Sequence, residues 1–371
     1  MLSCNQPVVK DIDILRIEEQ LRSGNLAQGK KVSDLEAKME QIVGRESAAA
    51  LSSATAAFEA VFEFIDLKEG DEVILSPLTF KSVPYSVIRR GATPVFIDTN
   101  DIFLPDWELV DRLLTDKTVA IITTSLYGMP DPNLNTLMRA LEYYPDVWII
   151  EDDAQSIGAR WNENRHIGSF HSRADFAIFS FYATKNIAAG EGGVVISDGY
   201  TDFFHMYRNN GVCRNYFNKT CIGTNMRMTD IEATLALSQL ERLDHVLKIR
   251  NDQANIYSNI LSIPNLQKEN LAPDSVHAFH HYTIMLPDGI DRVNIMSRLE
   301  ESGIKAGIYY DYLVNYDQGL RIKSRGIETP NALDQSKRAI CLPLGESLSH
   351  NDIKYIANKF EEILLSESAA R

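Results

Sequence analysis

The sequence from position 147 to position 155 reads Val147-Trp148-Ile149-Ile150-Glu151-Asp152-Asp153-Ala154-Gln155. An apolar run that can bury both faces is typical of a parallel strand covered by helices on either side. Open α/β sheets bind ligands beyond the carboxyl ends of such strands, where an unpaired buried carboxylate is costly. Two interpretations of the acidic residues follow. Either the strand exits into solvent and its acids cap the next turn, or one acid pairs with a cationic ligand group.

Similar apolar runs recur along the first two-thirds of the chain and predict further strands of the same sheet. They are Glu72–Ser76, Pro94–Asp98, Val119–Ser125, Ala174–Ser180 and Gly193–Ser197. Helical patterns lie between and before them, among them Ser33–Val43 and Ala54–Ile65. This alternation indicates βαβ units, and we predict an α/β fold with a large, mostly parallel central sheet.

The pattern of predicted strands and helices changes after a long predicted helix from Thr229 to about Arg250. The remaining part contains few strands and few helices, which indicates a smaller α+β domain. Its predicted strands are His281–Leu286 and Ile304–Tyr310, and its predicted helices are Val293–Glu301 and Asn351–Leu365. We therefore predict a large domain over residues 1–250 and a small C-terminal domain over residues 251–371.

Composition excludes several classes of protein. The 37 Lys and Arg residues against 51 Asp and Glu residues give a net charge of −14, which argues against a nucleic-acid partner. Residues Met1–Asp13 have no secretory pattern, and no run reaches the ~20 apolar residues of a membrane helix. None of the four cysteines forms a C-x-x-C pair, so we expect neither a zinc knuckle nor a disulfide scaffold. The expected setting is the reducing cytoplasm, away from membranes.

The His277-x-x-His280-His281 cluster is a weak candidate for a metal site. If this segment is a strand, His280 and His281 face opposite sides, and no third or fourth ligand is evident. We therefore predict no bound metal.

Two further segments could carry chemistry. Lys185 follows the predicted strand Ala174–Ser180 and stands beside the glycine-rich turn at residues 190–193. It is either a solvated surface lysine or a lysine whose pKa a dry pocket lowers, so that it can form a Schiff base. The small residues from Ser52 to Ala57 open a helix; they are either an ordinary N-cap or a phosphate site.

An amine for a Schiff base, an acid for a pyridine nitrogen and a phosphate site are together the three needs of pyridoxal 5′-phosphate (PLP). Motifs in the same order along nearly the whole chain resemble the DegT/DnrJ/StrS-type sugar aminotransferases, a PLP-dependent family with the type I aminotransferase fold. The matching stretches are Gly29–Val32, Ser53–Ala57, Gly70–Phe80, Gly91–Asp98, Glu151–Ala159, Phe179–Gly193, Arg208–Gly211 and Gly223–Asp230.

The resemblance implies roles for four residues around the cofactor ring. Lys185 would form the Schiff base and move the proton between Cα and C4′. Asp152 would pair with the pyridine nitrogen, Gln155 would contact the ring hydroxyl, and Phe80 would stack on the ring.

The resemblance also implies a phosphate site and an oligomer. Ala54 and Thr55 would bind the phosphate, and Ser180 would add its hydroxyl. Asn225 would reach the phosphate from the neighbouring subunit, so the expected active unit is a homodimer with shared active sites.

The implied reaction moves the amino group of glutamate, released as 2-oxoglutarate, to a keto group of a nucleotide-linked sugar. A lysine at position 185 favours this transamination over the dehydration of a related branch that has histidine there. A carbocyclic ketone of the aminocyclitol type is an alternative acceptor, and a non-catalytic PLP- or sugar-binding regulator is another. Candidate substrate contacts are Tyr182, Arg208, Lys219, Arg227 and Tyr309.

Three features depart from the family pattern. The stretch Tyr309–Asn315 lacks the usual prolines and histidine of a Tyr-Tyr-Pro-x-Pro-Leu-His motif. Lys81 stands where an apolar residue is commoner. Asp153 replaces a small residue beside Asp152, and because adjacent acids repel we expect Asp153 to face outward.

The basic residues between Arg208 and Arg227 form either a solvated loop or a diphosphate clamp.

Overall fold

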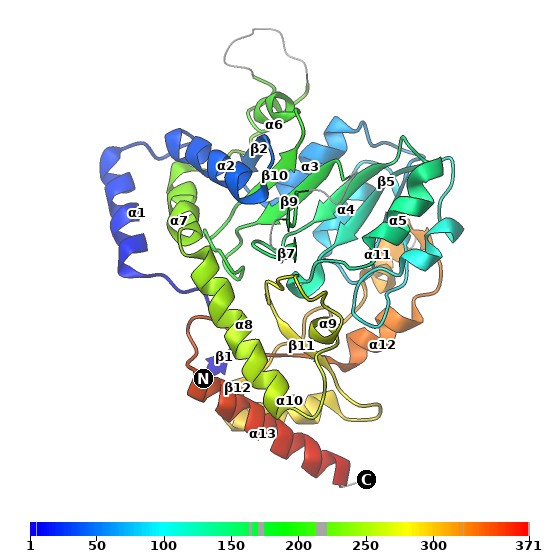
Figure 1. Cartoon of the computed structure of the whole chain (residues 1–371). Helices are drawn as coiled ribbons and strands as arrows, with labels where there is room; N and C mark the ends of the chain where they lie inside the picture. The colour runs from blue at the N-terminus through cyan, green and yellow to red at the C-terminus, as the bar shows by residue number, and fades with distance from the viewer. Residues whose placement is uncertain (5, 163–164, 170–173, 213–220, 322, 370–371) are drawn as a thin grey trace.

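The computed structural model describes residues 1–4, 6–162, 165–169, 174–212, 221–321 and 323–369. Its main body is built on an eight-stranded sheet in the order β13-β4-β3-β5-β6-β9-β10-β2 (Figure 1). Strand β10 runs antiparallel to both of its neighbours, and the other described pairs of this sheet are parallel. The strands are β2 (Ser47–Leu51), β3 (Glu72–Leu75), β4 (Thr93–Phe96), β5 (Thr118–Thr124), β6 (Trp148–Asp152), β9 (Phe176–Ser180), β10 (Gly193–Ser197) and β13 (Arg325–Gly326). The predicted α/β fold with a mostly parallel sheet is confirmed.

Helices cover both faces of this sheet, as the apolar strands require. Alternate residues of each strand enter different hydrophobic clusters: Ile149 belongs to one cluster and Ile150 to the other. The first cluster contains side chains of α2 (Lys30–Val43), α5 (Leu134–Ala140) and α7 (Asp230–Leu240). The second contains side chains of α3 (Ala54–Phe64), α4 (Ser82–Arg89) and α6 (Thr201–Tyr207).

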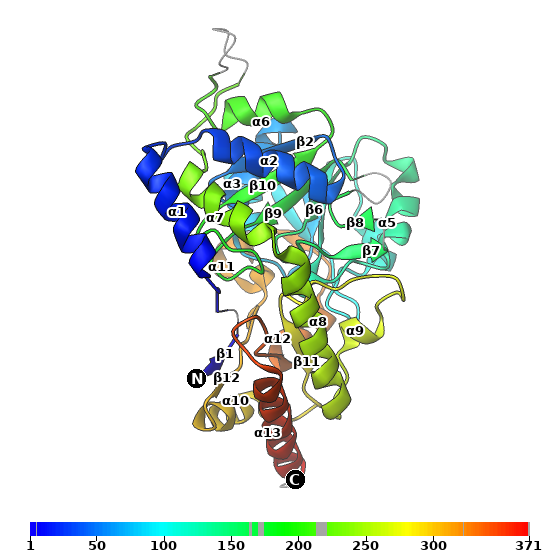
Figure 2. The same cartoon turned by 60° about the vertical axis from the view of Figure 1, so that its left-hand side comes forward.

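A small body lies at the lower end of the molecule, and α8 (Leu243–Ile260) leads into it directly from α7 (Figures 1 and 2). The antiparallel pair β11 (Tyr282–Met285) and β14 (Ala339–Leu342) forms a third hydrophobic cluster with α8, α10 (Arg292–Glu301) and α13 (His350–Ala369). The other described elements are α1 (Asp11–Ser23), α9 (Leu266–Glu269), α11 (Gln318–Arg321), α12 (Pro330–Arg338), β1 (Leu2–Ser3), β7 (Arg160–Asn162), β8 (Arg165–His166), β12 (Ile304–Lys305), and the 3₁₀ helices Trp107–Arg112, Leu126–Gly128, Leu141–Tyr143 and Val314–Tyr316.

The two bodies exchange segments. The first strand of the chain, β1, pairs with β12 of the small body, and β13 from the C-terminal part adds to the edge of the main sheet beside β4. The predicted helix from Thr229 to Arg250 is two helices, α7 and α8, with Glu241 and Arg242 between them. The predicted strand from Ile304 to Tyr310 is a strand only at its first two residues. The predicted domain boundary near residue 250 falls within α8.

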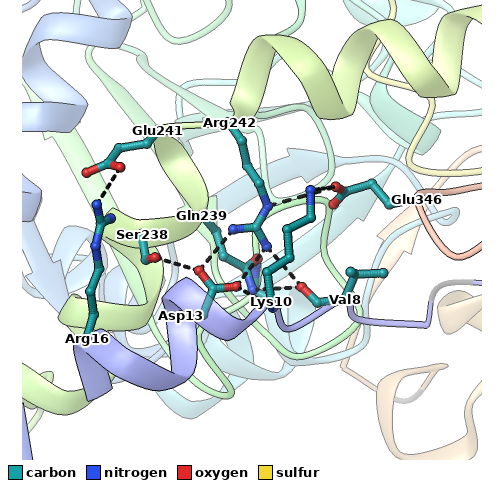
Figure 3. A network of polar contacts seen from close by, with 10 residues as sticks. Val8, Lys10, Asp13, Arg16, Ser238, Gln239, Glu241, Arg242 and Glu346 are labelled. Carbon is teal, nitrogen blue, oxygen red and sulfur yellow. Dashed lines mark hydrogen bonds and ion pairs between the residues drawn. The ribbon is translucent and has the colours of Figure 1, made fainter. Parts of the chain in front are cut away.

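A polar network joins the N-terminal segment to both bodies (Figure 3). Asp13 of α1 has no exposed surface, and the Arg242 guanidinium donates to both of its carboxylate oxygens, each at 2.9 Å. The same guanidinium donates to the Val8 carbonyl at 2.9 Å. Lys10 forms an ion pair at 3.0 Å with Glu346 of the small body. The network therefore anchors α1 at the junction of the two bodies.

No helix among the described residues is both long enough and apolar enough to cross a membrane.

Candidate active site

A cavity of about 790 Å³ opens beyond the carboxyl ends of β6 and β9, between the two bodies. It lies where an open α/β sheet is expected to bind its ligand. Nine of the residues predicted to contact cofactor or substrate line it: Ala54, Thr55, Phe80, Asp152, Gln155, Ser180, Tyr182, Lys185 and Tyr309. Phe80 and Tyr182 are largely exposed, at 58% and 47%.

The cavity holds a lysine and a carboxyl whose pKa values lie close to neutrality. Burial lowers the pKa of Lys185 to about 8, against the opposing effect of Asp152. Burial raises the pKa of Asp152 to about 6, although the Ala154 N–H, at 3.2 Å from Oδ1, and the Lys185 charge favour its ionised form. Within the described part of the chain no salt bridge is formed by Asp152. A buried carboxyl without an ion-pair partner at a ligand cavity fits a protonated pyridine nitrogen.

The N-terminus of α3 forms a second wall of the cavity. Ser53 caps the helix by accepting a hydrogen bond from the Ala56 N–H at 3.1 Å. The N–H groups of Ala54 and Thr55 belong to the first turn, where an α-helix offers no internal acceptor. A Cβ at Gly193 would lie 2.4 Å from the Ala54 nitrogen, so only glycine allows β10 to approach this turn. Free N–H groups at a positive helix end suit a phosphate.

The Gln155 amide is fixed by two tyrosines. Its Oε1 accepts from the Tyr127 backbone N–H at 2.7 Å, and its Nε2 donates to the Tyr310 hydroxyl at 2.7 Å. Both tyrosines have left-handed backbones, with φ of 61° and 66°. Tyr310 was not among the site residues predicted from the sequence. The only indication of its role there is that it follows Tyr309 in the loop that departs from the family pattern.

Two buried histidines line the same cavity, which corrects the expectation that His280 and His281 face opposite sides. That expectation required a strand, but β11 begins only at Tyr282, and the two rings lie 4.2 Å apart between centroids. The His281 ring stacks on the Tyr309 ring, with 3.6 Å between the ring centroids. Burial lowers the pKa of both imidazoles well below the ordinary value, so both are neutral. No group of metal ligands is found among the described residues.

Asp153 is buried, so the prediction that it faces outward is wrong. Asp153 follows the last residue of β6, and its side chain is 1% exposed, so it lies in the protein interior rather than in solvent. Its Oδ1 accepts from the hydroxyls of Ser125 at 2.8 Å and Ser156 at 3.1 Å. Burial raises its pKa to about 7 despite these two hydrogen bonds.

Three basic or amide candidates do not line the cavity. Arg208 is 3% exposed; it pairs with Glu36 and donates to the Ala50 carbonyl, so it joins α2 to β2. Arg227 donates to the Asn209 side chain at 2.8 Å. Asn225, exposed in the single chain, pairs by its backbone with Asn209. Lys219 lies outside the described residues.

Comparisons with known proteins identify a family and a related protein. The family model described as the DegT/DnrJ/EryC1/StrS aminotransferase family matches residues 8–361. The spore coat polysaccharide biosynthesis protein SpsC of Bacillus subtilis (strain 168) is 30% identical over 381 residues, covering 96% of each chain.

Solved structures have the same fold. Helicobacter pylori PseC, an aminotransferase involved in the biosynthesis of pseudoaminic acid, superposes with a TM-score of 0.91 at 23% identity over 98% of this chain and 99% of that one. DesV of S. venezuelae superposes with a TM-score of 0.86 at 26% identity over 95% of this chain and 94% of the other.

Proposed function

The chain belongs to the DegT/DnrJ/EryC1/StrS aminotransferase family and is a PLP-dependent aminotransferase, and we propose that it aminates a keto group of a nucleotide-linked sugar with glutamate as amino donor. The observation that carries this proposal is the pairing, in one cavity, of Lys185 with a near-neutral pKa and of Asp152 without an ion-pair partner. These are the amine and the acid that a PLP-dependent transaminase requires.

The residues of the cavity fit the cofactor ring. Lys185 would bond to the aldehyde carbon of PLP, and Asp152 would hold the proton on the pyridine nitrogen. Gln155 would donate to the ring oxygen, and Phe80 would cover one face of the ring. When bound, PLP supplies an electron sink for the electron pair released at the substrate Cα.

The helix end fits the cofactor phosphate. Ala54 and Thr55 would donate their backbone N–H groups to it, and Ser180 would add its hydroxyl from the end of β9. Asn225 is not among the residues that line this chain's own cavity, and the family resemblance supports a phosphate contact from Asn225 of the partner subunit in a homodimer.

Lys185 also moves the proton. A pKa of about 8 lets the amine exist in both protonation states near neutral pH, which is the condition for efficient general acid–base catalysis. The Lys185 amine would therefore be the group that takes the proton from the substrate Cα and returns it during the transfer of the amino group.

The sugar is placed at the mouth of the cavity. Tyr182 and Tyr309 line the mouth from the main and small bodies, and Lys81 offers a positive charge there. Such a charge suits a diphosphate oxygen of a nucleotide-linked sugar. The buried ion pair of Arg208 with Glu36 gives that arginine a structural role instead.

The cysteines are consistent with a cytoplasmic location, which we include in the proposal. Cys4, Cys221 and Cys341 are all free thiols, as a reducing compartment requires.

The proposal is tested by spectroscopy and by turnover. The PLP-loaded protein should absorb near ~420 nm through its cofactor–lysine linkage. It should release 2-oxoglutarate from glutamate repeatedly, beyond one equivalent per site, only when a ketone acceptor is present. Lys185→Ala should lose both properties. Lys68→Ala, which alters an exposed lysine paired with Asp66, should keep both.

The acceptor is identified by presenting keto-sugar nucleotides and inosose-type carbocyclic ketones separately to the aminated cofactor form. Turnover of the sugar nucleotides alone supports the proposal, whereas preference for the carbocyclic ketones contradicts the substrate class. Absence of both the absorbance band and 2-oxoglutarate release contradicts the proposed function itself.

A further inference from the structure

The two hydrogen bonds of the Gln155 side chain decide which way its amide faces. The Tyr127 backbone N–H can only donate, so the atom opposite it at 2.7 Å must be the amide oxygen. The nitrogen then faces the Tyr310 hydroxyl, also at 2.7 Å. An amide nitrogen carries two N–H groups, and Tyr310 accepts only one of them. The second N–H is left for an acceptor in the cavity, which Gln155 lines.

Tyr310 is held firmly enough to fix that orientation. Its ring lies 6.4 Å from the Tyr127 ring, and burial raises the pKa of its hydroxyl above the ordinary value. The hydroxyl is therefore uncharged. Its backbone φ of 66° is unfavourable for a bulky residue and persists only where the surroundings enforce it. The Tyr310 hydroxyl therefore holds a defined position and orients the flexible Gln155 amide.

Tyr310 and Gln155 come from different bodies of the molecule. Gln155 follows β6 of the main sheet, and Tyr310 follows β12 of the small body. The hydrogen bond between them joins the two bodies at the cavity, so the position of the small body influences the orientation of the Gln155 amide.

We propose that Tyr310 is a positioning residue that aims the second Gln155 N–H at the ring oxygen of the cofactor. This rests on the proposed function, in which Gln155 donates to that oxygen. Without the Tyr310 hydroxyl the Gln155 amide loses one of its two anchors and turns more freely, so its donation to the ring oxygen weakens. The ring oxygen then carries its negative charge with less stabilisation, and the neighbouring cofactor–lysine nitrogen holds its proton to higher pH.

The test is a pH titration of the absorbance near ~420 nm in the PLP-loaded protein. Tyr310→Phe removes one oxygen and keeps the ring. Its titration midpoint should rise by about half a unit to one unit, the size expected for one neutral hydrogen bond. Gln155→Ala should shift the midpoint in the same direction and at least as far. Adding Tyr310→Phe to Gln155→Ala should shift it no further, because Tyr310 acts through Gln155.

Tyr282→Phe is the matched control. Tyr282 is a buried tyrosine of the small body whose hydroxyl bonds Ser258 at 3.1 Å, and it does not line the cavity. Removing its hydroxyl should leave the midpoint unchanged, whereas a general effect of hydroxyl loss would move it.

Three outcomes overturn the inference: no shift in Tyr310→Phe, an equal shift in the presence and absence of Gln155, or an equal shift in Tyr282→Phe. The rate of PLP release from Tyr310→Phe gives a second measurement, since weaker positioning should accelerate it. If the wild-type protein shows no such band, the proposed function fails. If the wild-type band titrates and Tyr310→Phe does not move it, only the inference fails.

Discussion

Replacing Arg242 by alanine should destabilise the protein through the carboxylate that it leaves behind. Asp13 is completely buried, and the guanidinium supplies two of its hydrogen bonds at 2.9 Å. Removing one partner of a buried ion pair costs about 3–5 kcal/mol, because the other charge stays buried and uncompensated. We expect Arg242→Ala to lower the free energy of unfolding by this amount.

The assay is urea unfolding of the cofactor-free protein, since bound PLP would add its own stabilisation. Arg16→Ala is the control. Arg16 lies in α1, the helix that contains Asp13, and pairs with Glu241 at 2.8 Å (Figure 3). That pair is solvent-exposed, so its loss should cost no more than about 1 kcal/mol. The double variant Asp13→Leu/Arg242→Leu removes both charges and should lose less than the two single variants together.

The pH dependence gives a second check on the same ion pair. Burial acts to raise the pKa of Asp13, but hydrogen bonds from Arg242 and Ser238 outweigh it and hold the pKa below the ordinary 3.8. The pair therefore stabilises the fold fully above the ordinary carboxyl pKa, and this stabilisation is lost as the pH falls through the lower folded-state pKa. Arg242→Ala should show less of this acid-range loss. If Arg242→Ala lowers the free energy of unfolding no more than Arg16→Ala does, the buried pair does not supply the expected stabilisation.

Three further predictions concern other buried groups. Asp153→Asn should gain stability relative to wild type as the pH rises from 4 to 8, because burial raises the folded-state pKa of the acid above its ordinary 3.8 and the acid then destabilises the fold as it ionises; urea unfolding at both pH values measures this. Gly193→Ala should weaken PLP binding by about 1–3 kcal/mol, because its Cβ would lie 2.4 Å from the Ser53 carbonyl carbon; a fluorimetric PLP titration that gives the wild-type dissociation constant would contradict this. Glu36→Gln should lower the free energy of unfolding by about 3 kcal/mol or more, because it leaves the buried Arg208 charge unpaired, while the KM for the sugar stays at the wild-type value; an altered KM with normal stability would place Arg208 in substrate binding.

The fold and the chemical centre of the site follow from local patterns. Each apolar strand has a recognisable composition, and an open sheet gathers the residues after its strands at one edge. This is enough to bring Asp152 and Lys185 into one cavity. The same reasoning places Ser53 as a cap, because a hydroxyl before a helical pattern is a local signal.

The features that were not predicted from the sequence depend on contacts between residues that lie far apart in the chain. Repulsion between adjacent acids predicted that Asp153 faces outward, but nothing in the local sequence says that two serines hold its carboxyl in the protein interior. Arg208 finds its carboxylate in Glu36, far away in the chain. Tyr310 acquires its importance only when the small body packs against the main sheet. The break between α7 and α8 was missed because the apolar pattern continues across it.

The pairing of β1 with β12 has a consequence for the order of folding. β1 precedes the central sheet in the sequence, yet its partner strand β12 is made only after seven of the eight strands of that sheet and α8. Until then β1 has no partner strand, whereas α1 can dock once Arg242 has been made. Pairing of β1 with β12 is therefore a late step, which requires that most of the chain has already been synthesised.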